Sequence, residues 1–418
     1  MFNNLEKIKY LLKYITTKVR EKGFIHCIKV GFLWLIRKTF SSIMGFVSLP
    51  FCFAFNIKFL NVLTSRIGHL CVEPDCYIKE EILDRHPKYR ALILAPRGSV
   101  ANEHMPSYWE RYIRIIRSPL LCTILKPLSN NRFTGYNVYR YASPINAAAD
   151  FPRIQRMYDK TGGRPLLSLT DCDFRRGSDL LRTYGMPRDA WFVCVHCREE
   201  GYIPGEGQTY RNADITSYLP AMEAIIERGG WVIRLGDPSM GEIPVNKYII
   251  DYAHLDNRSD WMDVFLCAAC KFFLGSASGL CMISSTFGIP SAIANQAPVS
   301  VILPYLPQDI GIPKLLYSLT ENRYLRFAEI LGSPVGNFRF DSLYKEANIC
   351  VIDNTAEDIK ALAMEMFDRI DGEMIYTAED NLLQERFKSL MNASHYSYRS
   401  VSRIGREFLR KYSFLLDD

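Results

Sequence analysis

The sequence predicts an α/β protein made of two halves, each a parallel sheet covered by helices. Short apolar segments alternate with longer amphipathic segments along most of the 418 residues, and 48% of all residues are hydrophobic. Such alternation is typical of a parallel sheet with helices on its faces. A chain of this length holds two or three domains with sizeable cores.

The first half is expected to span residues 64–185. Its pattern predicts strands and helices in alternation, with strands at residues 91–95, 120–125 and 166–170 and helices near residues 103–117 and 144–160. The turn-rich stretch at residues 184–189 is expected to be the linker between the halves.

The pattern then restarts in a second unit, residues 186–352. Strands are expected at residues 191–196, 231–235, 271–274 and 291–294, and helices at residues 217–228, 259–269 and 279–287. The tail, residues 353–418, reads as helices, among them residues 356–368 and 396–412. These helices are expected either to pack back across both domains or to present a solvated amphipathic face.

Residues 1–63 form a basic, apolar segment. The formal net charge is +8 over residues 1–60 and −2 over the rest of the chain. Aromatic and aliphatic residues flanked by cations suit an anionic membrane surface, so this segment predicts peripheral binding to the inner face of the cytoplasmic membrane. A single membrane span or a buried helical hairpin are the alternatives. The near-neutral remainder argues against nucleic acid as a partner.

The twelve cysteines are irregularly spaced, which predicts reduced, mostly buried thiols of a cytoplasmic protein. The pairs Cys194/Cys197 and Cys267/Cys270 have zinc-like spacing, but they fall inside a predicted strand and a predicted helix rather than on tight turns. No metal or other cofactor is therefore expected.

A Gly/Ser-rich turn joins the strand at residues 271–274 to the helix after it. Its residues Gly275, Ser276, Ser278 and Gly279 are small enough to let an anion approach the backbone at a helix N-terminus. The turn lacks both the Walker Lys-Ser/Thr pair and the GxGxxG spacing. It predicts a phosphate cradle, and the alternative is a turn that serves tight packing.

Polar residues that follow the strand ends provide the other predicted ligands. Arg198 follows the strand at residues 191–196 and offers planar donors suited to a diphosphate. The long polar loop at residues 201–214 suits a substrate-contacting flap. Its Arg211, Asn212 and Asp214 precede a helix, so Asn212 or Asp214 could instead cap it. Arg234 and Asp237 are expected to bind the phosphate and the ribose, respectively. Alternatively, these two side chains pair with each other.

These segments together resemble a family of bacterial glycosyltransferases. The resemblance rests on WFVCVHCREE at residues 191–200, YRNAD at residues 210–214, GGWVIRLGDPS at residues 229–239, the stretch RSDWMDVFLCAACKFFLGSASGL at residues 258–280, and RIGHL at residues 66–70. It covers roughly residues 66–298. More distantly, the chain is similar to the nucleotide-sugar half of GT-B fucosyltransferases and heptosyltransferases. Glu199 stands where a second Arg often occurs, so GDP-fucose is not implied.

The resemblance implies a GT-B-like fold, with two Rossmann-like domains facing a cleft. It also implies transfer of a sugar from a nucleotide-sugar donor to a surface glycan or lipid-linked acceptor, with Arg198, Arg211 and the Gly/Ser turn holding the donor diphosphate. The reaction would be metal-independent and inverting.

A general base must take the acceptor proton, and the sequence does not choose it. The candidates are Glu103, His104, Asp171, Asp173, Glu199 and Asp214. Two alternatives stay open. Asp171-Cys172-Asp173 could hold a divalent metal as in GT-A transferases, or form a helix cap. The protein could also be a non-catalytic scaffold that binds nucleotide sugar or glycan.

Overall fold

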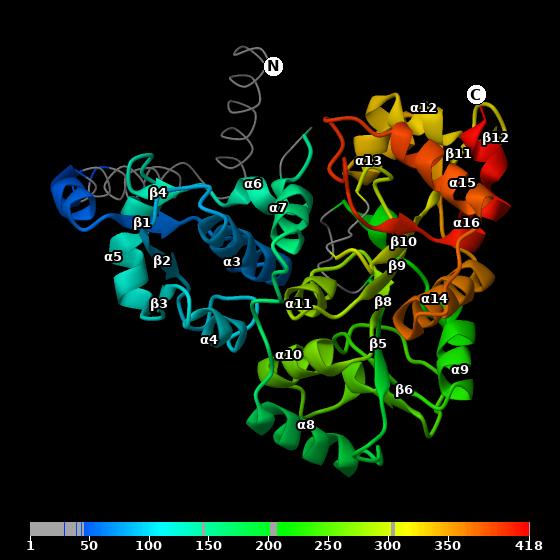
Figure 1. The fold of residues 1–418 in the computed structure, drawn as a ribbon, viewed down its shortest axis with the longest axis horizontal. Helices are drawn as coiled ribbons and strands as arrows, with labels where there is room; N and C mark the ends of the chain where they lie inside the picture. The colour runs from blue at the N-terminus through cyan, green and yellow to red at the C-terminus, as the bar shows by residue number, and fades with distance from the viewer. Residues whose placement is uncertain are drawn as a thin grey trace.

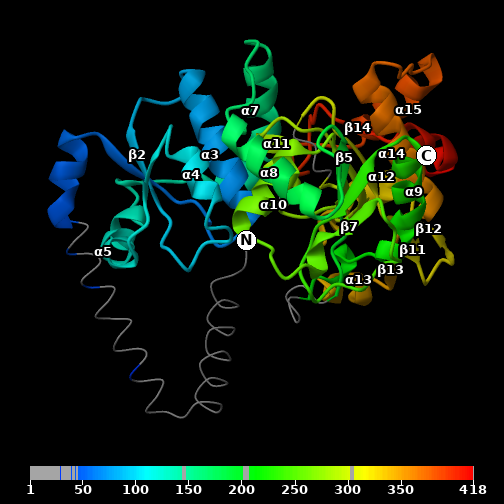
Figure 2. The ribbon, with the colours of Figure 1, turned by 90° about the horizontal axis from the view of Figure 1, so that it is seen from below.

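The computed structural model describes residues 46–143, 147–200, 207–301 and 306–417, together with Lys29, Thr39 and Ile43. It contains two α/β units that lie side by side, with the N-terminal unit on the left of Figure 1. Figure 2 shows the same two units from below. Both main sheets are parallel throughout, so the predicted α/β fold with two Rossmann-like units is confirmed.

The N-terminal unit is built on a four-stranded sheet of order β3-β2-β1-β4. Its strands are β1 (Ile57–Leu60), β2 (Arg90–Leu94), β3 (Arg114–Ile116) and β4 (Gly135–Tyr136), and its helices are α3 (Ile67–Ile82), α4 (Met105–Trp109), α5 (Pro119–Ser129), α6 (Tyr139–Ala142) and α7 (Asp150–Asp159). The inner strand β1 lies within the segment expected to bind the membrane. Its residues Phe59 and Leu60 are buried, so the sheet begins before residue 64.

Three predictions in this unit are wrong. Residues 120–125 are helical, because Ser118 caps α5 through Leu121 N and Pro119 takes the first turn, where its missing N–H costs nothing. Residues 166–170 form no regular strand. The helix expected at residues 103–117 is only the short α4, and the chain then enters β3. The remaining helix, expected at residues 144–160, is α7.

The second unit is built on a seven-stranded sheet of order β14-β10-β9-β8-β5-β6-β7. Its strands are β5 (Phe192–His196), β6 (Trp231–Arg234), β7 (Ile249–Asp251), β8 (Phe273–Ser276), β9 (Ser291–Gln296), β10 (Ile310–Pro313) and β14 (Arg403–Ile404). Its helices include α8 (Asp171–Thr183), α9 (Leu219–Glu227), α10 (Asp260–Ala269), α11 (Cys281–Thr286) and α14 (Ala356–Asp371). The strands predicted here from the sequence are all present, because each is a nearly continuous buried apolar run.

The C-terminal part of the chain adds a small antiparallel sheet of order β12-β11-β13. Its strands are β11 (Leu315–Ser318), β12 (Arg323–Tyr324) and β13 (Ile349–Ile352), and the accompanying helices are α12 (Phe327–Leu331), α13 (Asp341–Glu346), α15 (Ala378–Ser389) and α16 (Arg406–Lys411). The predicted helix at residues 396–412 is reduced to α16, because β14 joins the edge of the large sheet beside β10.

A loop rather than a helix carries the tail back to the N-terminal unit. Ala148 N donates to Ala393 O and Ala149 N donates to Tyr396 O, both at 2.9 Å. The Tyr396 ring packs 5.6 Å from that of Phe151, and its hydroxyl donates to Ala142 O. The tail therefore contacts both units, and it does so through the loop around residues 393–396 rather than through a helix.

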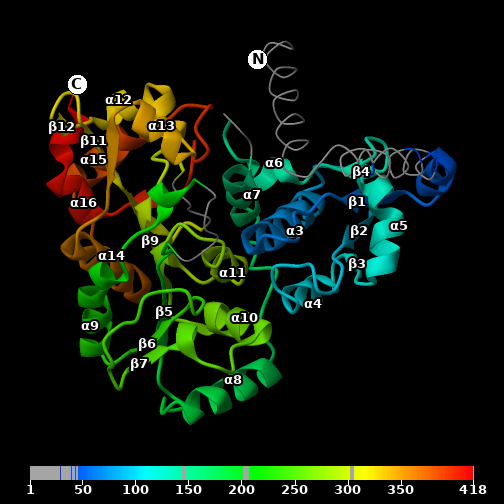
Figure 3. The same ribbon diagram turned by 180° about the vertical axis from the view of Figure 1, so that it is seen from behind.

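The two units also meet where the first turn of α3 touches the turn before α11, an arrangement that Figure 3 shows from behind. A Cβ on Gly68 would lie 3.3 Å from the Gly279 Cα, and one on Gly279 would lie 3.0 Å from the Gly68 N. Helix α8 packs against α10 through Gly177, which leaves no room for a side chain beside Phe265. It thus belongs with the second unit.

Of residues 1–45, only Lys29, Thr39 and Ile43 are described, so most of the predicted membrane segment lies outside the described residues. Within the described part of the chain, no helix has the length and apolarity required to cross a membrane. The cysteines described there are free thiols, and most are buried, as predicted.

Candidate functional site

Arg198 follows the carboxyl end of β5 and lies where this strand meets the end of β8 and the segment around residue 212. The strand is buried along its whole length, and Arg198 itself is only 6% exposed. Its backbone N donates to Ser276 Oγ at 2.8 Å, and its Nε donates to Asn212 Oδ1 at 3.2 Å. These bonds tie the ends of β5 and β8 to the segment around residue 212. The carboxyl edge of a parallel sheet is where ligand sites are built.

Arg211 and Asn212 belong to a short 3-10 turn that is held from several sides. Arg211 Nη2 donates to Ala277 O at 2.9 Å, which places its guanidinium on the Gly/Ser turn. The Asn212 carbonyl accepts a hydrogen bond from Lys314 Nζ, and this ammonium also pairs with Asp353 at 2.6 Å. Asn212 therefore links Arg198 to a second cation.

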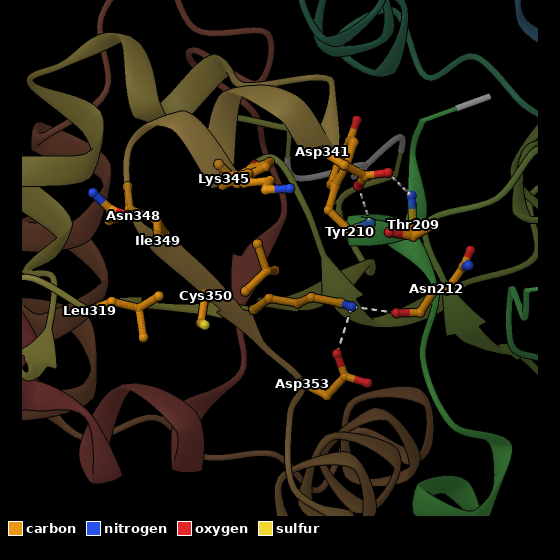
Figure 4. Close-up of a pocket in the computed structure, with 13 residues that line it drawn as sticks. Thr209, Tyr210, Asn212, Leu319, Asp341, Lys345, Asn348, Ile349, Cys350 and Asp353 are labelled. Atoms are coloured by element: carbon orange, nitrogen blue, oxygen red, sulfur yellow. Dashed lines mark hydrogen bonds and ion pairs between the residues drawn. The ribbon is translucent and has the colours of Figure 1, made fainter. Parts of the chain in front are cut away.

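A cavity of about 450 Å³ opens on the other side of this turn, as Figure 4 shows. Asp341 at its rim accepts hydrogen bonds from Thr209 N and Tyr210 N, both at 2.9 Å. Lys314 and Asp353, which form an ion pair, both line it. The carboxylate of Asp341 thus fixes the 3-10 turn that carries Arg211.

The Tyr210 hydroxyl lies in the electrostatic field of several charged side chains. Burial raises the pKa of this hydroxyl, Arg211, Arg339 and Arg198 each act to lower it, and Asp341 acts to raise it. Two of these guanidiniums are placed by contacts at the carboxyl edge of the sheet, Arg198 on Asn212 and Arg211 on Ala277. Such a cluster of planar donors suits an anion with several oxygens, such as a diphosphate.

The Gly/Ser turn contributes to this edge in a different way from the one expected. Ser276 is fully buried, and its hydroxyl accepts the Arg198 amide. A Cβ on Gly275 would lie 2.3 Å from the His196 carbonyl oxygen, and one on Gly279 would lie 2.6 Å from Ile67 Cγ2. Both glycines therefore meet packing requirements, which was the alternative interpretation. Ser278 Oγ is buried without a hydrogen-bond partner among the described residues.

Arg234 and Asp237 each have partners of their own. The Arg234 side chain is fully buried and pairs with Glu199 at 2.7 Å and with Asp251 at 3.3 Å, so it has no surface left for a ligand. Asp237 accepts hydrogen bonds from Ser239 N and Oγ in a local turn. These contacts show that Arg234 and Asp237 do not pair with each other and that Arg234 is already paired with two carboxylates, whereas a ribose contact by Asp237 stays a prediction.

Two of the carboxylates proposed as bases are held by structural partners. Burial raises the pKa of Glu199, whereas Arg234 opposes this shift. Asp214 accepts a hydrogen bond from Thr216 N at 2.8 Å and thereby caps a 3-10 helix (Ile215–Tyr218), in line with the capping interpretation.

His104 and Glu103 lie on the loop after β2, against the start of α10. Burial lowers the pKa of His104, partly opposed by Asp173 and Asp260. The Glu103 amide donates to Asp260 Oδ2 at 2.5 Å, and its carboxylate pairs with Arg117. This loop therefore joins the two units at the start of α10.

The Asp-x-Asp motif forms the start of α8. Asp173 completes a capping box with Thr170, and it also accepts a hydrogen bond from Trp261 Nε1 at 3.1 Å. The structure thus gives Asp173 the helix-cap role. Within the described ranges, no group of three His, Cys, Asp or Glu side chains is arranged to hold a metal ion.

Four residues of this region were missed in the sequence. Lys314, Arg339 and Asp341 come from the region where the resemblance fades, and no local motif marks them. His69 lies inside the RIGHL segment, and its Nδ1 is 2.7 Å from Glu73 Oε1. The spacing of four residues on a helix was a readable signal for this pair.

No protein-family model matches the chain, and no curated protein matches it. Among solved structures, the chain is similar to the ADP-heptose lipopolysaccharide heptosyltransferase II of E. coli, with a TM-score of 0.39, 11% identity, and coverage of 58% of this chain and 86% of that one. It is also similar to the glycosyl transferase family 9 structure from Veillonella parvula DSM 2008, with a TM-score of 0.35, 10% identity, and coverage of 72% and 78%.

A third similar structure is the iron-containing dodecameric glycosyltransferase TibC from enterotoxigenic E. coli H10407. The TM-score is 0.32, the identity is 13%, and the match covers 57% of this chain and 59% of that one. Because these TM-scores are below 0.5, the function proposed below rests on the residues of this chain.

Proposed function

We propose that this protein is a glycosyltransferase that moves a sugar from a nucleotide-sugar donor to a glycan or lipid-linked acceptor. The observation that carries the proposal is the placement of two guanidiniums at the carboxyl edge of the large sheet, where Arg198 donates to Asn212 and Arg211 donates to Ala277 of the Gly/Ser turn. The sequence resemblance described above supports the same assignment.

In this proposal the guanidiniums act on the leaving group. As the bond between the anomeric carbon and the diphosphate oxygen breaks, negative charge builds on the diphosphate. Preorganised donors stabilise charge that develops in the transition state, and this is the role that a metal ion plays in other transferases. Arg198 is already held by Asn212 and Arg211 by Ala277, so little reorganisation is required. We propose that the reaction needs no metal and inverts the anomeric centre.

We further propose that the protein works on the inner face of the cytoplasmic membrane. Exposed apolar side chains gather at the far end of the N-terminal unit, on the helical residues 46–54 and on α5, and the most exposed are Phe46, Val47, Phe51, Phe53 and Leu120. Cys52 packs in one small core with Cys122 of α5, so the two helices are neighbours. Lys58 and Arg132 border this surface and suit anionic headgroups.

The test is thermal stabilisation by UDP, GDP, ADP, CMP and their sugars, with and without EDTA. We expect one nucleotide class to stabilise the wild type, by about 2.7 kcal/mol at a hundredfold excess over its Kd, and EDTA to leave this unchanged. Arg198→Ala should abolish the shift. The matched control is Arg228→Ala, because Arg228 pairs with Asp368 at the opposite edge of the sheet.

The outcomes separate the alternatives. Loss of stabilisation in EDTA would replace the metal-independent mechanism with a metal-dependent one. Arg198-dependent binding without release of nucleoside diphosphate, in the presence of bacterial glycan extracts, would favour the non-catalytic scaffold. No stabilisation by any nucleotide would refute the donor site.

A further inference from the structure

We propose that His69 is the catalytic base of this reaction and that Glu73 is its positioning residue. The inference rests on the proposed function and deepens it, since it assigns the acceptor-side group that the sequence left open. It is carried by the geometry of α3, whose first turn lies at the carboxyl edge of the small sheet and faces the second unit.

The two side chains form a hydrogen-bonded pair. His69 Nδ1 lies 2.7 Å from Glu73 Oε1, and the Glu73 side chain is fully buried, whereas that of His69 is 19% exposed. The other Glu73 oxygen accepts a hydrogen bond from Leu63 N at 3.0 Å, which fixes the carboxylate. A carboxylate accepts only, so in the neutral imidazole Nδ1 carries the proton and Nε2 keeps a lone pair.

The surroundings of the ring also hold its orientation. It stacks on Tyr139 with a centroid distance of 5.7 Å and an interplanar angle of 10°. Nε2 lies 3.4 Å from Ser143 Oγ, a long contact that an incoming hydroxyl can replace. Glu73 and Tyr139 therefore orient the imidazole, and Nε2 makes a long contact with Ser143.

The location of His69 relative to the donor site follows from one backbone contact. Its neighbour Gly68 packs on Gly279, and Arg211 is held on Ala277, two residues before Gly279. In the sequence, His69 is one residue from this contact in the N-terminal unit, and the Ala277 carbonyl that holds Arg211 is two residues from it in the second unit. An acceptor bound against the N-terminal unit would meet both the base and the donor there.

The other candidate bases have competing partners or lie elsewhere, as Asp171 does in the first turn of α8. Glu199 pairs with Arg234, Glu103 pairs with Arg117, and Asp214 and Asp173 cap helices. His104 lies at the α10 junction instead of beside Gly279. His69 alone among the bases considered combines a buried carboxylate partner with a place at the Gly68–Gly279 contact.

The step balances as follows. The acceptor hydroxyl oxygen forms a bond to the anomeric carbon while the bond from that carbon to the diphosphate oxygen breaks. The electron pair of the broken bond leaves with the nucleoside diphosphate, and the hydroxyl proton moves to His69 Nε2. Glu73 stabilises the resulting imidazolium through Nδ1–H.

The experiment measures release of nucleoside diphosphate from UDP-, GDP- and ADP-sugars, with bacterial glycan extract as acceptor. We expect His69→Gln, which keeps an amide for Glu73 but accepts no proton, to lower kcat by about 10²–10⁴-fold while donor KM stays within about twofold. His86→Gln serves as the control, because His86 stacks on Tyr77 away from the Gly68–Gly279 contact. Exogenous imidazole should restore part of the activity of His69→Ala.

Glu73→Gln tests the positioning role. It should lower kcat by at least about tenfold with donor KM unchanged, whereas a purely structural defect would reduce the fraction of folded enzyme and leave the kcat of that fraction intact. Wild-type kcat in folded His69→Gln would overturn the dyad and leave the transferase intact. Absence of turnover by the wild type with every donor would refute the proposed function, and the dyad with it.

Discussion

Replacing Gly279 with Ala tests the contact that joins the two units. The added Cβ would lie 2.6 Å from Ile67 Cγ2 and 3.0 Å from the Gly68 backbone N. Carbon atoms pack best at about 3.5–4.0 Å, so the overlap with Ile67 is about 1 Å, and the Gly68 backbone cannot rotate away as a side chain can. We expect α3 and the Gly/Ser turn to be pushed apart.

The size of the effect follows from two opposing contributions. Overpacking of this kind costs about 1–3 kcal/mol. Gly279 does not adopt a left-handed conformation, so Ala recovers roughly 0.4–1 kcal/mol by restricting the unfolded chain. The net loss should be about 1–2 kcal/mol, which corresponds to a Tm decrease of roughly 2–8 °C for a unit of this size.

The assay is a thermal melt combined with nucleoside diphosphate release. Gly68→Ala is the graded comparison, because its Cβ would lie 3.3 Å from the Gly279 Cα, and it should be milder. Gly241→Ala is the control, since its nearest neighbour would be Glu199 Oε1 at 3.5 Å, an ordinary contact. A Gly279→Ala protein with wild-type Tm and wild-type activity would refute the inference that the units meet at this glycine.

Two further predictions concern pH and membranes. Burial raises the pKa of Asp309 to about 7. Between about pH 4 and pH 7 the folded protein therefore retains a proton that the unfolded chain releases. The free energy of unfolding should fall by up to about 4 kcal/mol as the pH rises through this range. Urea unfolding at pH 5 and pH 8 covers the part of this window above pH 5, so the wild type should lose about 3 kcal/mol and Asp309→Asn less. Equal decreases would contradict the assignment. Wild-type protein should sediment with vesicles that contain anionic lipid, and much less of a triple variant, Phe46→Ser/Phe51→Ser/Phe53→Ser, should do so. The control is Phe340→Ser, because Phe340 is similarly exposed but lies in the second unit. Equal recovery of all three proteins would argue against the proposed membrane surface.

The second unit was predictable because its strands are buried on both faces. Runs such as Phe192–His196 are continuously apolar and end in polar residues, so the local pattern determines both the element and the edge where Arg198 emerges. The N-terminal unit was harder. Its strands are short, β3 and β4 having three and two residues, and Pro119–Ser129 is apolar enough to resemble a strand until its N-terminal cap is considered.

The sequence by itself determined the α/β class, four strands of the second unit, and the presence of Arg198, Arg211 and the Gly/Ser turn. These follow from local periodicity and from residue types at strand ends. Only the tertiary structure decided that Arg234 pairs with Glu199 and Asp251 and that Gly279 packs on Gly68. It also decided that Lys314 and Arg339 lie near the predicted ligands. Each of these depends on contacts between segments far apart in the chain, where burial and charge pairing, rather than spacing in the sequence, determine what a side chain touches.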